Sequence, residues 1–315
     1  AKSGNGNYAK NTGKTPGAVF DRSCGKGFDD MGRLLGKVAL ITGGTSGMGV
    51  VTAQRFADEG AQVVLTGRSK ERGEAVAGEI GGNARFIAMD AGDEGQIKAA
   101  IDFAVATFGR LDCLFNNAGS IAHPARIEKI TTEQFNAEMS TLVGGVLFAM
   151  KHAIPIMRQQ GGGSIINNAS TAGHRTGHGP VLYSIAKAAV LHLTRVVALQ
   201  IADSTIRVNS ISPACVATPM FSIGTDMTQE QSAASMPIIE RELAKIVPLG
   251  RAGSSADVAA TLVFLASDES AYITAQDIAV DGGLIAGYTQ GEMIDKFGGM
   301  RQALLDELAE MTKAE

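Results

Sequence analysis

A tyrosine and a lysine are spaced so that they could transfer a proton together. Tyr183 and Lys187 are four residues apart in a segment, 183–202, that has the pattern of a helix. Side chains at this spacing lie one turn apart on the same face. A tyrosine with an ordinary pKa of about 10 is a poor base at neutral pH, but an adjacent ammonium favours its phenolate. Tyr183 is therefore a candidate to take a proton from an alcohol or to donate one to a ketone. Taken alone, the same spacing is also common on ordinary helix surfaces.

A glycine-rich turn is the second candidate for chemistry. The stretch Thr42-Gly43-Gly44-Thr45-Ser46-Gly47-Met48-Gly49 follows the apolar run 38–41 and precedes a helical pattern. Glycines at this place let the backbone approach a pyrophosphate, and the start of the following helix offers free N–H groups and a partial positive charge. The turn therefore predicts a dinucleotide site, the alternative being an ordinary turn between a strand and a helix.

Short apolar runs separated by helical patterns are the elements that must position these residues. Seven runs are candidate strands: 38–41, 62–65, 85–88, 111–115, 164–166, 206–208 and 277–280. Helix-length segments lie between them at 47–59, 94–108, 132–159 and 183–202, and Ser254-x-x-Asp257 is a capping signature before one more. This alternation predicts an α/β fold, a single doubly wound, Rossmann-type, parallel seven-stranded sheet with helices on both faces.

The two ends of the chain differ from this pattern. Residues 1–36 are a glycine-rich N-terminal arm without an apolar repeat, and we expect the arm to dock on its own or a neighbouring subunit. Residues 37–286 are the predicted Rossmann-fold domain. Residues 287–315 are a helical tail with one apolar stripe. The stripe consists of Met300, Leu304, Leu308 and Met311.

Composition and charge exclude several classes of protein. The formal net charge is −4 and no basic stripe stands out, so we expect no nucleic-acid partner. No apolar run of 18 residues is uninterrupted, and no apolar stretch near the start fits a secretory signal, so we expect no membrane partner. Three cysteines without a C-x-x-C spacing indicate neither a disulfide framework nor zinc, and they favour a cytoplasmic protein. Histidines and carboxylates show no metal-ligand spacing.

Taken together, the motifs resemble those of the short-chain dehydrogenase/reductase family. The glycine turn has the spacing G-x-x-x-G-x-G, and the family's further motifs follow in order over nearly all of residues 37–286. The resemblance implies an oxidoreductase that uses NAD(P), with Tyr183 as general acid and base, Lys187 beside it, and Ser170 hydrogen-bonded to the substrate oxygen. The further motifs are Asn116-Asn117-Ala118-Gly119, Ser170, Tyr183-x-x-x-Lys187, Arg207-Val208-Asn209 with Pro213, and Asp281-Gly282-Gly283.

The end of the second strand bears on the choice of cofactor. In dinucleotide folds an acidic residue there binds the ribose 2′-OH, whereas an arginine accommodates a 2′-phosphate. Gly67 stands at the acidic position and Arg68 follows it, so we expect NADP(H), with NAD(H) as the alternative. The cofactor-binding residues implied by the resemblance are Gly43, Thr45, Ser46, Gly47, Met48, Gly49, Arg68, Asp90, Ala91, Asn117, Ala118, Gly119, Tyr183, Lys187, Pro213, Val216 and Thr218.

One position departs from the family pattern. The family has a fourth catalytic residue, an asparagine, in the long helix before the fifth strand, where it helps to hold a water-linked proton path to the lysine. Aligning Phe135, Gly145 and Val146 with the pattern places Leu142 at that position. Three interpretations remain open: an active enzyme with a rerouted relay, an impaired or very selective enzyme, and a cofactor-binding sensor or scaffold with little turnover.

Substrate contacts are expected from the loop before Tyr183 and from the segment 219–248. The second segment is rich in methionine, phenylalanine and isoleucine, which predicts an adaptable apolar pocket roof and a hydrophobic secondary alcohol or ketone as substrate. The alternatives are that these residues pack the segment itself and that the histidines are ordinary polar loop residues. The candidate substrate contacts are Leu142, His174, His178, Met220 and Phe221.

Two predicted helices carry apolar residues around most of their circumference. These are the segments 132–159 and 183–202, and helices of this kind need burial on several sides. The family resemblance implies that they pair across two-fold axes in a homotetramer.

Overall fold

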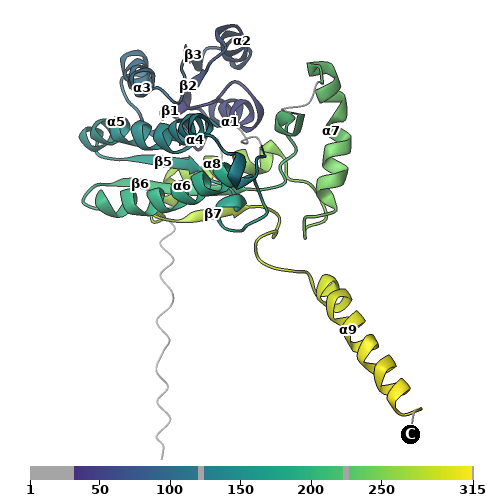
Figure 1. Ribbon diagram of the computed structural model, residues 1–315. Helices are drawn as coiled ribbons and strands as arrows, with labels where there is room; N and C mark the ends of the chain where they lie inside the picture. Colours follow the sequence, from purple (N-terminus) through teal and green to yellow (C-terminus); the bar gives the residue numbers. More distant parts are fainter. Residues whose placement is uncertain (1–31, 120–123, 223–226, 314–315) are drawn as a thin grey trace, which may run out of the picture. The chain divides into compact units, whose positions relative to one another are not determined.

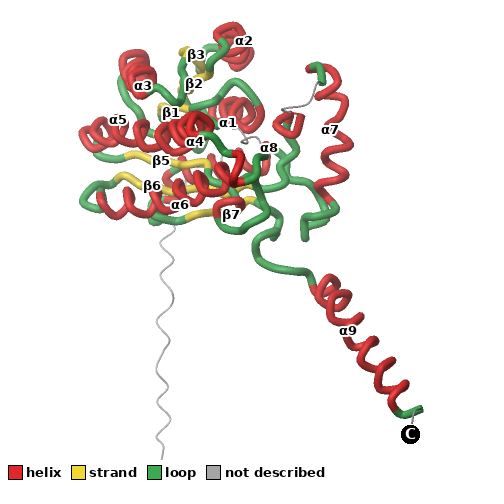
Figure 2. The backbone as a smooth tube through the Cα atoms, in the orientation of Figure 1, coloured by secondary structure: helices red, strands yellow, loops and turns green. Residues whose placement is uncertain are grey.

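A computed structural model describes residues 32–119, 124–222 and 227–313, and within them seven parallel strands form one sheet. The strand order is β3-β2-β1-β4-β5-β6-β7, so the predicted doubly wound sheet is confirmed. Short, mostly apolar runs form the central strands, which are buried on both faces. Figure 2 shows these strands as the yellow segments. The strands are β1 (Val38–Ile41), β2 (Gln62–Gly67), β3 (Ala84–Ala88), β4 (Cys113–Asn116), β5 (Gly163–Asn168), β6 (Ile206–Pro213) and β7 (Asp277–Val280).

Helices cover both faces of the sheet, each over its own apolar core (Figure 1). On one face α3 packs against α5, and α6 packs against β6. On the other face α1 packs against α8, and α2 lies beside β3. The helices are α1 (Gly47–Asp58), α2 (Lys70–Ile80), α3 (Glu94–Phe108), α4 (Thr132–Met139), α5 (Gly145–Gln160), α6 (Val181–Gln200), α7 (Gln229–Ala244), α8 (Ser255–Ala266) and α9 (Gln290–Met311).

The strand order defines where a ligand can bind. β1 lies between β2 and β4, so the chain runs outward from β1 in one direction and then returns to continue in the other. The loops after β1 and β4 therefore leave the sheet toward opposite faces. In sheets of this kind the ligand crevice lies outside the carboxyl ends of the strands at such a switch point.

The domain begins before the position that the sequence indicated. Leu34 is buried, and its amide donates to the carbonyl of Glu59 at 2.9 Å. Arg33 forms an ion pair with Glu269, and Lys37 forms one with Asp268. Residues 32–36 therefore belong to the packed domain, while the rest of the predicted arm lies outside the described residues.

Two apolar helical stretches have the length of a membrane span. By length and hydropathy, Thr132–Gln160 and Val181–Gln200 could each cross a bilayer, although we expected no such segment from the sequence. The first stretch comprises α4, a π-helical segment η3 (Ser140–Gly144) and α5. Both stretches bury part of their surface in the fold, as core helices of the same composition do.

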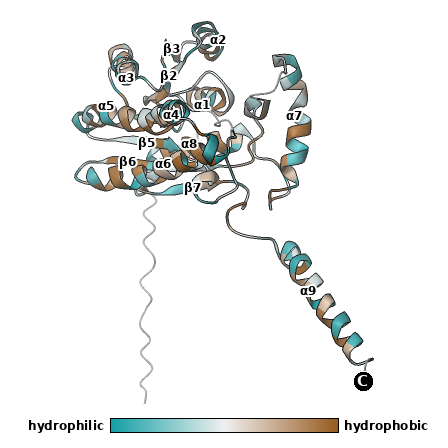
Figure 3. Ribbon diagram, viewed as in Figure 1, coloured by the Kyte–Doolittle hydropathy of each residue, from teal (hydrophilic) through white to brown (hydrophobic). Residues whose placement is uncertain are grey.

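The predicted helical tail forms α9, which starts with a capping box between Thr289 and Glu292. Apolar and polar bands alternate along it (Figure 3), and its stripe from Met300 to Met311 is exposed. None of the described residues of α9 is buried.

Candidate active site

Tyr183 and Lys187 lie together on the first turns of α6. Leu182 and Ala186 on the same helix are buried, so this part of the helix turns its side chains inward. The Lys187 ammonium lies 5.4 Å from the centroid of the Tyr183 ring. Lys187 is only 5% exposed, and Tyr183 is half-buried. The helix therefore holds the phenol and the ammonium side by side in the protein.

Ser170 reaches Tyr183 from the carboxyl end of β5. It precedes a short helical turn, η4 (Thr171–Gly173), and its backbone is extended there, with φ −173° and ψ 156°. Its Oγ accepts a hydrogen bond from the amide of Ala172 at 3.2 Å, and a side-chain hydrogen bond joins it to Tyr183. The structure thus brings together the three residues that the sequence indicates as catalytic.

Burial governs the charge of both titratable groups. It raises the pKa of the Tyr183 phenol above its ordinary value, and the hydrogen bond with Ser170 acts in the opposite direction. Burial lowers the pKa of the Lys187 ammonium to about 8. The four-residue spacing predicts that the ammonium favours the phenolate, but in the structure the ammonium lies over the ring and donates to the carbonyl of Asn168, so desolvation dominates. With these neighbours the phenol keeps its proton at neutral pH and is a proton donor.

Asn168, the last residue of β5, holds the lysine. The Nζ of Lys187 donates to the backbone carbonyl of Asn168 at 2.5 Å. The side-chain Nδ2 of Asn168 donates to Oδ1 of Asn117 at 3.1 Å. We did not predict a role for this residue. A second asparagine directly after Asn167, at the end of the strand, is the signal that could have indicated one.

The turn after β1 forms a cradle that suits an anion. Gly43 has φ +66°, and a Cβ on Gly49 would lie 2.2 Å from the Gly43 oxygen, so neither position accepts a side chain without strain. The N-cap of α1, Ser46, makes no side-chain capping bond, and the first turn holds no acidic residue. The N–H groups and the positive dipole end of α1 are therefore available to a phosphate. These residues fit the pyrophosphate of a dinucleotide.

The other residues implied for the cofactor follow the carboxyl ends of the strands. The amides of Asn117 and Ala118 donate to Oγ1 of Thr42 at 2.9 and 3.0 Å, which ties the loop after β4 to the turn after β1. Arg68 is exposed directly after β2. The predicted residues at the end of β6 and in the loops after β3, β4 and β6 lie at the same edge of the sheet, and they are Asp90, Ala91, Gly119, Pro213, Val216 and Thr218.

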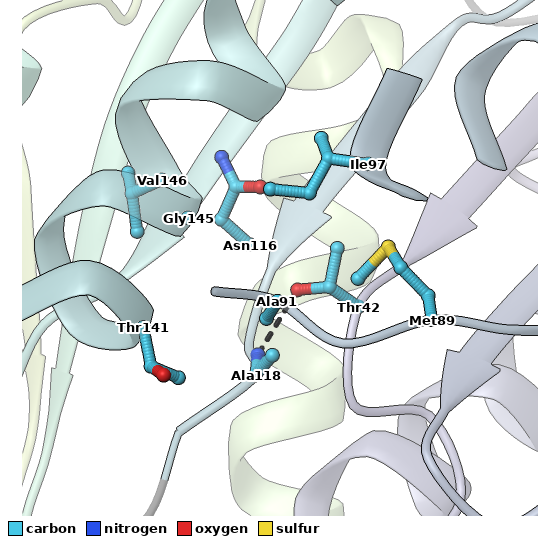
Figure 4. Close-up of a pocket in the computed structure, with 9 residues that line it drawn as sticks. All are labelled: Thr42, Met89, Ala91, Ile97, Asn116, Ala118, Thr141, Gly145 and Val146. Carbon is cyan, nitrogen blue, oxygen red and sulfur yellow. Dashed lines mark hydrogen bonds between the residues drawn. The ribbon is translucent and has the colours of Figure 1, made fainter. Parts of the chain in front are cut away.

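A small cavity lies below this edge (Figure 4). Its volume of about 10 Å³ is just enough for one water molecule, and it is too small for a substrate or a cofactor. The buried Asn116 lines it, and its Oδ1 has no hydrogen-bond partner among the described residues. The cavity is therefore part of the packing beneath the crevice. Its lining residues are Thr42, Met89, Ala91, Ile97, Asn116, Ala118, Thr141, Gly145 and Val146.

Leu142 lies in the π-helical segment between α4 and α5. It is 3% exposed, and its Cδ2 lies 2.8 Å from the place where a Cβ on Gly119 would be. Its side chain therefore packs against the loop after β4. A leucine there offers no hydrogen bond to a proton path.

The residues predicted to contact the substrate differ in their exposure and in their hydrogen-bond partners. Nε2 of His174 lies 2.8 Å from Asp277 Oδ2 and 3.1 Å from Ser212 Oγ, so the structure engages this ring nitrogen with β6 and β7. His178 is half-buried, and its Nδ1 has no hydrogen-bond partner among the described atoms. Phe221 is 45% exposed in η5 (Pro219–Ser222), whereas the Met220 side chain lies outside the described part of the chain. Substrate contact by these residues stays a prediction.

Comparison with known proteins relates the whole domain to dehydrogenases and reductases. A family model described as enoyl-(acyl carrier protein) reductase matches residues 43–285. The chain is 39% identical over 259 residues to 2,5-dichloro-2,5-cyclohexadiene-1,4-diol dehydrogenase of Sphingobium indicum, covering 81% of this chain and 98% of the relative. It is 38% identical over 264 residues to 3-alpha-(or 20-beta)-hydroxysteroid dehydrogenase of Mycobacterium tuberculosis, covering 83% of this chain and 94% of the relative. The crystal structure of levodione reductase is similar with a TM-score of 0.74 at 33% identity, covering 81% of this chain and 100% of the other.

Proposed function

Because this chain belongs to the short-chain dehydrogenase/reductase family, we propose that it interconverts a hydrophobic secondary alcohol and its ketone with NADP(H). The family resemblance drawn from the motifs is thereby confirmed, and with it an oxidoreductase that uses NAD(P). The observation that carries the finer proposal is the group of Ser170, Tyr183 and Lys187 at the crevice edge, next to the open phosphate cradle.

The proposed reduction uses each side chain at a stated atom. The Tyr183 hydroxyl donates its proton to the ketone oxygen, and the Ser170 hydroxyl hydrogen-bonds the same oxygen as negative charge develops on it. The buried Lys187 ammonium stabilises the tyrosinate that remains, since charges interact strongly where water is excluded. The bound nicotinamide supplies or accepts the hydride. In alcohol oxidation Tyr183 must first lose its proton, which the positive charge of an oxidised nicotinamide would favour, and the phenolate then takes the hydroxyl proton.

The preference for NADP(H) rests on the end of β2. A Cβ on Gly67 would lie 2.6 Å from Thr45 Oγ1, so a carboxylate that could bind a 2′-OH has no room at position 67 unless Thr45 moves. Arg68 is exposed and forms no ion pair within the described residues, so it is available to a 2′-phosphate. Lys70 and Arg72 at the start of α2 add positive charge nearby in the sequence. NAD(H) is the alternative if Arg68 does not contact the cofactor.

We predict that Arg68→Ala weakens NADPH binding by roughly 10- to 100-fold, because a charge-assisted hydrogen bond to phosphate contributes about 1.5–3 kcal/mol. The Kd for NADH is expected to change little. Fluorescence titration of both cofactors measures the two values. Arg126→Ala is the matched control, since Arg126 is an exposed arginine paired with Glu128. Equal losses for NADPH and NADH would contradict the assignment.

The proposed substrate class rests on the segment around α7. Met227 and Ile238 are half-exposed, as Phe221 is, while Leu243 and Val247 are buried beneath. An apolar and adaptable surface of this kind suits a hydrophobic ring better than a sugar. The relatives' names point to cyclic alcohols and ketones, among them carveol in the Mentha piperita relative, which is 38% identical over 256 residues. An alicyclic, terpenoid or steroid-like substrate is therefore proposed.

The direct test is absorbance at 340 nm with NADPH or NADH against cyclic, steroidal and sugar ketones. Turnover of cyclic or steroidal ketones with NADPH would support the proposal. A sugar ketone with a much higher kcat/KM than any cyclic ketone would overturn the proposed substrate class. Cofactor binding without turnover across the panel would favour the second candidate, a cofactor sensor or scaffold with little turnover, for which Leu142 is the supporting observation.

We predict that Leu142→Asn leaves kcat within about threefold of the wild type and lowers stability by about 2–4 kcal/mol. Leu142 fills a buried apolar site, where an unpartnered amide is costly, and Lys187 is already held by the carbonyl of Asn168. Steady-state kinetics and denaturant unfolding measure the two effects. Leu142→Val separates the loss of volume from the added polarity. A tenfold or larger rise in kcat would mean that the missing amide limits this enzyme.

We also propose a cytoplasmic homotetramer that pairs α5 and α6 across two-fold axes. Exposed apolar side chains on these helices support this, because a solvated helix would not carry them in such number. Light scattering is expected to give four times the mass of the chain. A monomeric mass would contradict the pairing. The side chains are Leu147, Ile185, Val196 and Leu199.

A further inference from the structure

A continuous chain of hydrogen bonds runs from the glycine turn to the buried lysine. Nδ2 of Asn117 donates to the carbonyls of Thr42 and Gly43 at 3.1 and 3.0 Å. Oδ1 of Asn117 accepts from Nδ2 of Asn168 at 3.1 Å, and the carbonyl of Asn168 accepts from Lys187 Nζ at 2.5 Å. This series of hydrogen bonds runs from the end of β1, past the end of β4, to the end of β5. Within the described residues, this path joins the phosphate cradle to the lysine through polar atoms.

Asn168 differs from the asparagine that precedes it in the same strand. Asn167 is satisfied at both ends of its amide: Oδ1 accepts from Asn116 at 2.8 Å, and Nδ2 donates to Thr194 on α6 at 2.9 Å. Side chains alternate between faces along a strand, so Asn168 lies on the opposite face, toward Asn117. Asn167 therefore connects the sheet with α6, whereas Asn168 connects it with the phosphate cradle.

The amide of Asn168 is costly to keep where it is. The residue is 7% exposed, and its Oδ1 has no hydrogen-bond partner among the described residues. Leaving a buried carbonyl oxygen unpartnered destabilises a fold, whereas an apolar side chain of similar size would avoid that cost. A leucine would remove this cost, but it would also take the donor away from Oδ1 of Asn117. The amide contributes something other than packing energy, and its one hydrogen bond leads to Asn117.

We propose that Asn168 is a positioning residue that couples the glycine turn to Lys187, an inference that rests on the proposed function. Its side chain anchors the end of β5 to the cradle, and this anchoring fixes the direction of the carbonyl that receives the ammonium. The lysine is thereby held at a set place beside Tyr183. Loss of the anchor lets the peptide unit rotate and the ammonium shift, and electrostatic effects depend steeply on position in a buried site.

The test compares Asn168→Leu with Thr194→Val. The first removes the amide toward the cradle, and the second removes the partner of Asn167 on the opposite face of the same strand. For Asn168→Leu we expect kcat to fall by about 10- to 100-fold with KM within about twofold, as for a loss of positioning in the reacting complex. For Thr194→Val we expect a lower Tm with kcat unchanged. Equal kcat losses in both variants, or a lower Tm without a change of kcat in Asn168→Leu, would overturn the proposal.

A second measurement tests the proposal without turnover. The titration of Lys187 is followed by NMR of 13C-methylated lysines, with Lys187→Met assigning the resonance. Asn168→Asp places a carboxylate next to the ammonium and is expected to raise the pKa of Lys187 by about one unit or more, and Asn168→Leu is expected to change its shift or linewidth. Unchanged Lys187 signals in both variants would overturn the coupling. If the wild type neither binds NAD(P) nor turns over a ketone, the proposed function fails, while the NMR result still decides whether Asn168 positions the lysine.

Discussion

Replacing Tyr183 by phenylalanine is expected to lower kcat by roughly 10³-fold, within the 10²- to 10⁴-fold range of a lost general acid. The phenylalanine ring keeps the packing of the half-buried side chain and loses the hydroxyl. In the structure this hydroxyl is the group that bonds Ser170 and that burial keeps protonated. Without it the described part of the crevice loses the phenol to which we assign the proton transfer. Binding of NADPH is expected to stay within about threefold, because the phosphate cradle is untouched.

The control for this variant is Tyr272→Phe. Tyr272 is fully exposed and has no place in the crevice, so its variant should match the wild type in kcat and in Kd. Single-turnover absorbance at 340 nm separates the chemical step from product release. A Tyr183→Phe enzyme with more than about a tenth of the wild-type rate would mean that another group transfers the proton, since general acids contribute at least 10²-fold.

Lys187→Met is expected to abolish most of the activity and to stabilise the protein at neutral pH. Burial lowers the pKa of Lys187 from 10.5 to about 8, so the folded protein holds a charge that the fold disfavours. The difference, 10.5 − 8, corresponds to roughly 3 kcal/mol at about 1.4 kcal/mol per unit. Part of this is offset because methionine leaves the Asn168 carbonyl without its donor. We expect the free energy of unfolding of Lys187→Met to exceed that of the wild type by about 1–2 kcal/mol at pH 7.

The effect of Lys187→Met on stability depends on pH. Between about pH 8 and pH 10.5 the unfolded lysine binds a proton more readily than the folded one. The contribution of Lys187 to stability therefore rises with pH through this window, and the full cost is present below it. The increase in stability caused by Lys187→Met should accordingly be largest at pH 7 and should be smaller at pH 10. Denaturant unfolding of both proteins at the two pH values measures it. A variant less stable than the wild type at pH 7 would show that the buried ammonium stabilises the fold.

The sheet and the grouping of Ser170, Tyr183 and Lys187 were predictable because their signals are local. The apolar run at 38–41 has the same bounds as β1, and the run at 277–280 has the same bounds as β7. Two residues that are four positions apart in a helix, such as Tyr183 and Lys187, lie on the same face whatever surrounds the helix. The strand-end motifs meet because all strands of a parallel sheet share one carboxyl edge.

Features that depend on contacts between distant segments were not predictable in this way. The long predicted helix 132–159 contains the π-helical turn Ser140–Gly144, and no residue pattern in it marks the change. The sequence leaves His174 either as a substrate contact or as a polar loop residue, and it gives no sign of the contact with Asp277, 103 residues away. The raised pKa of Tyr183 likewise comes from burial, which a four-residue spacing does not reveal. The positioning role that we propose for Asn168 requires knowing that β4 and β5 are neighbours.

The pairing of β1 with β4 has a consequence for how the protein is made. Ala39 pairs with Cys113, so about seventy residues must be synthesised after β1 before its second neighbour exists. Contacts this far apart in the chain form slowly, and newly made segments wait exposed until they do. The glycine turn is completed only when Asn117 and Ala118 bond to it from the loop after β4. Competence to bind a dinucleotide therefore arises late in folding, and a chain that binds one has already joined the two halves of its sheet.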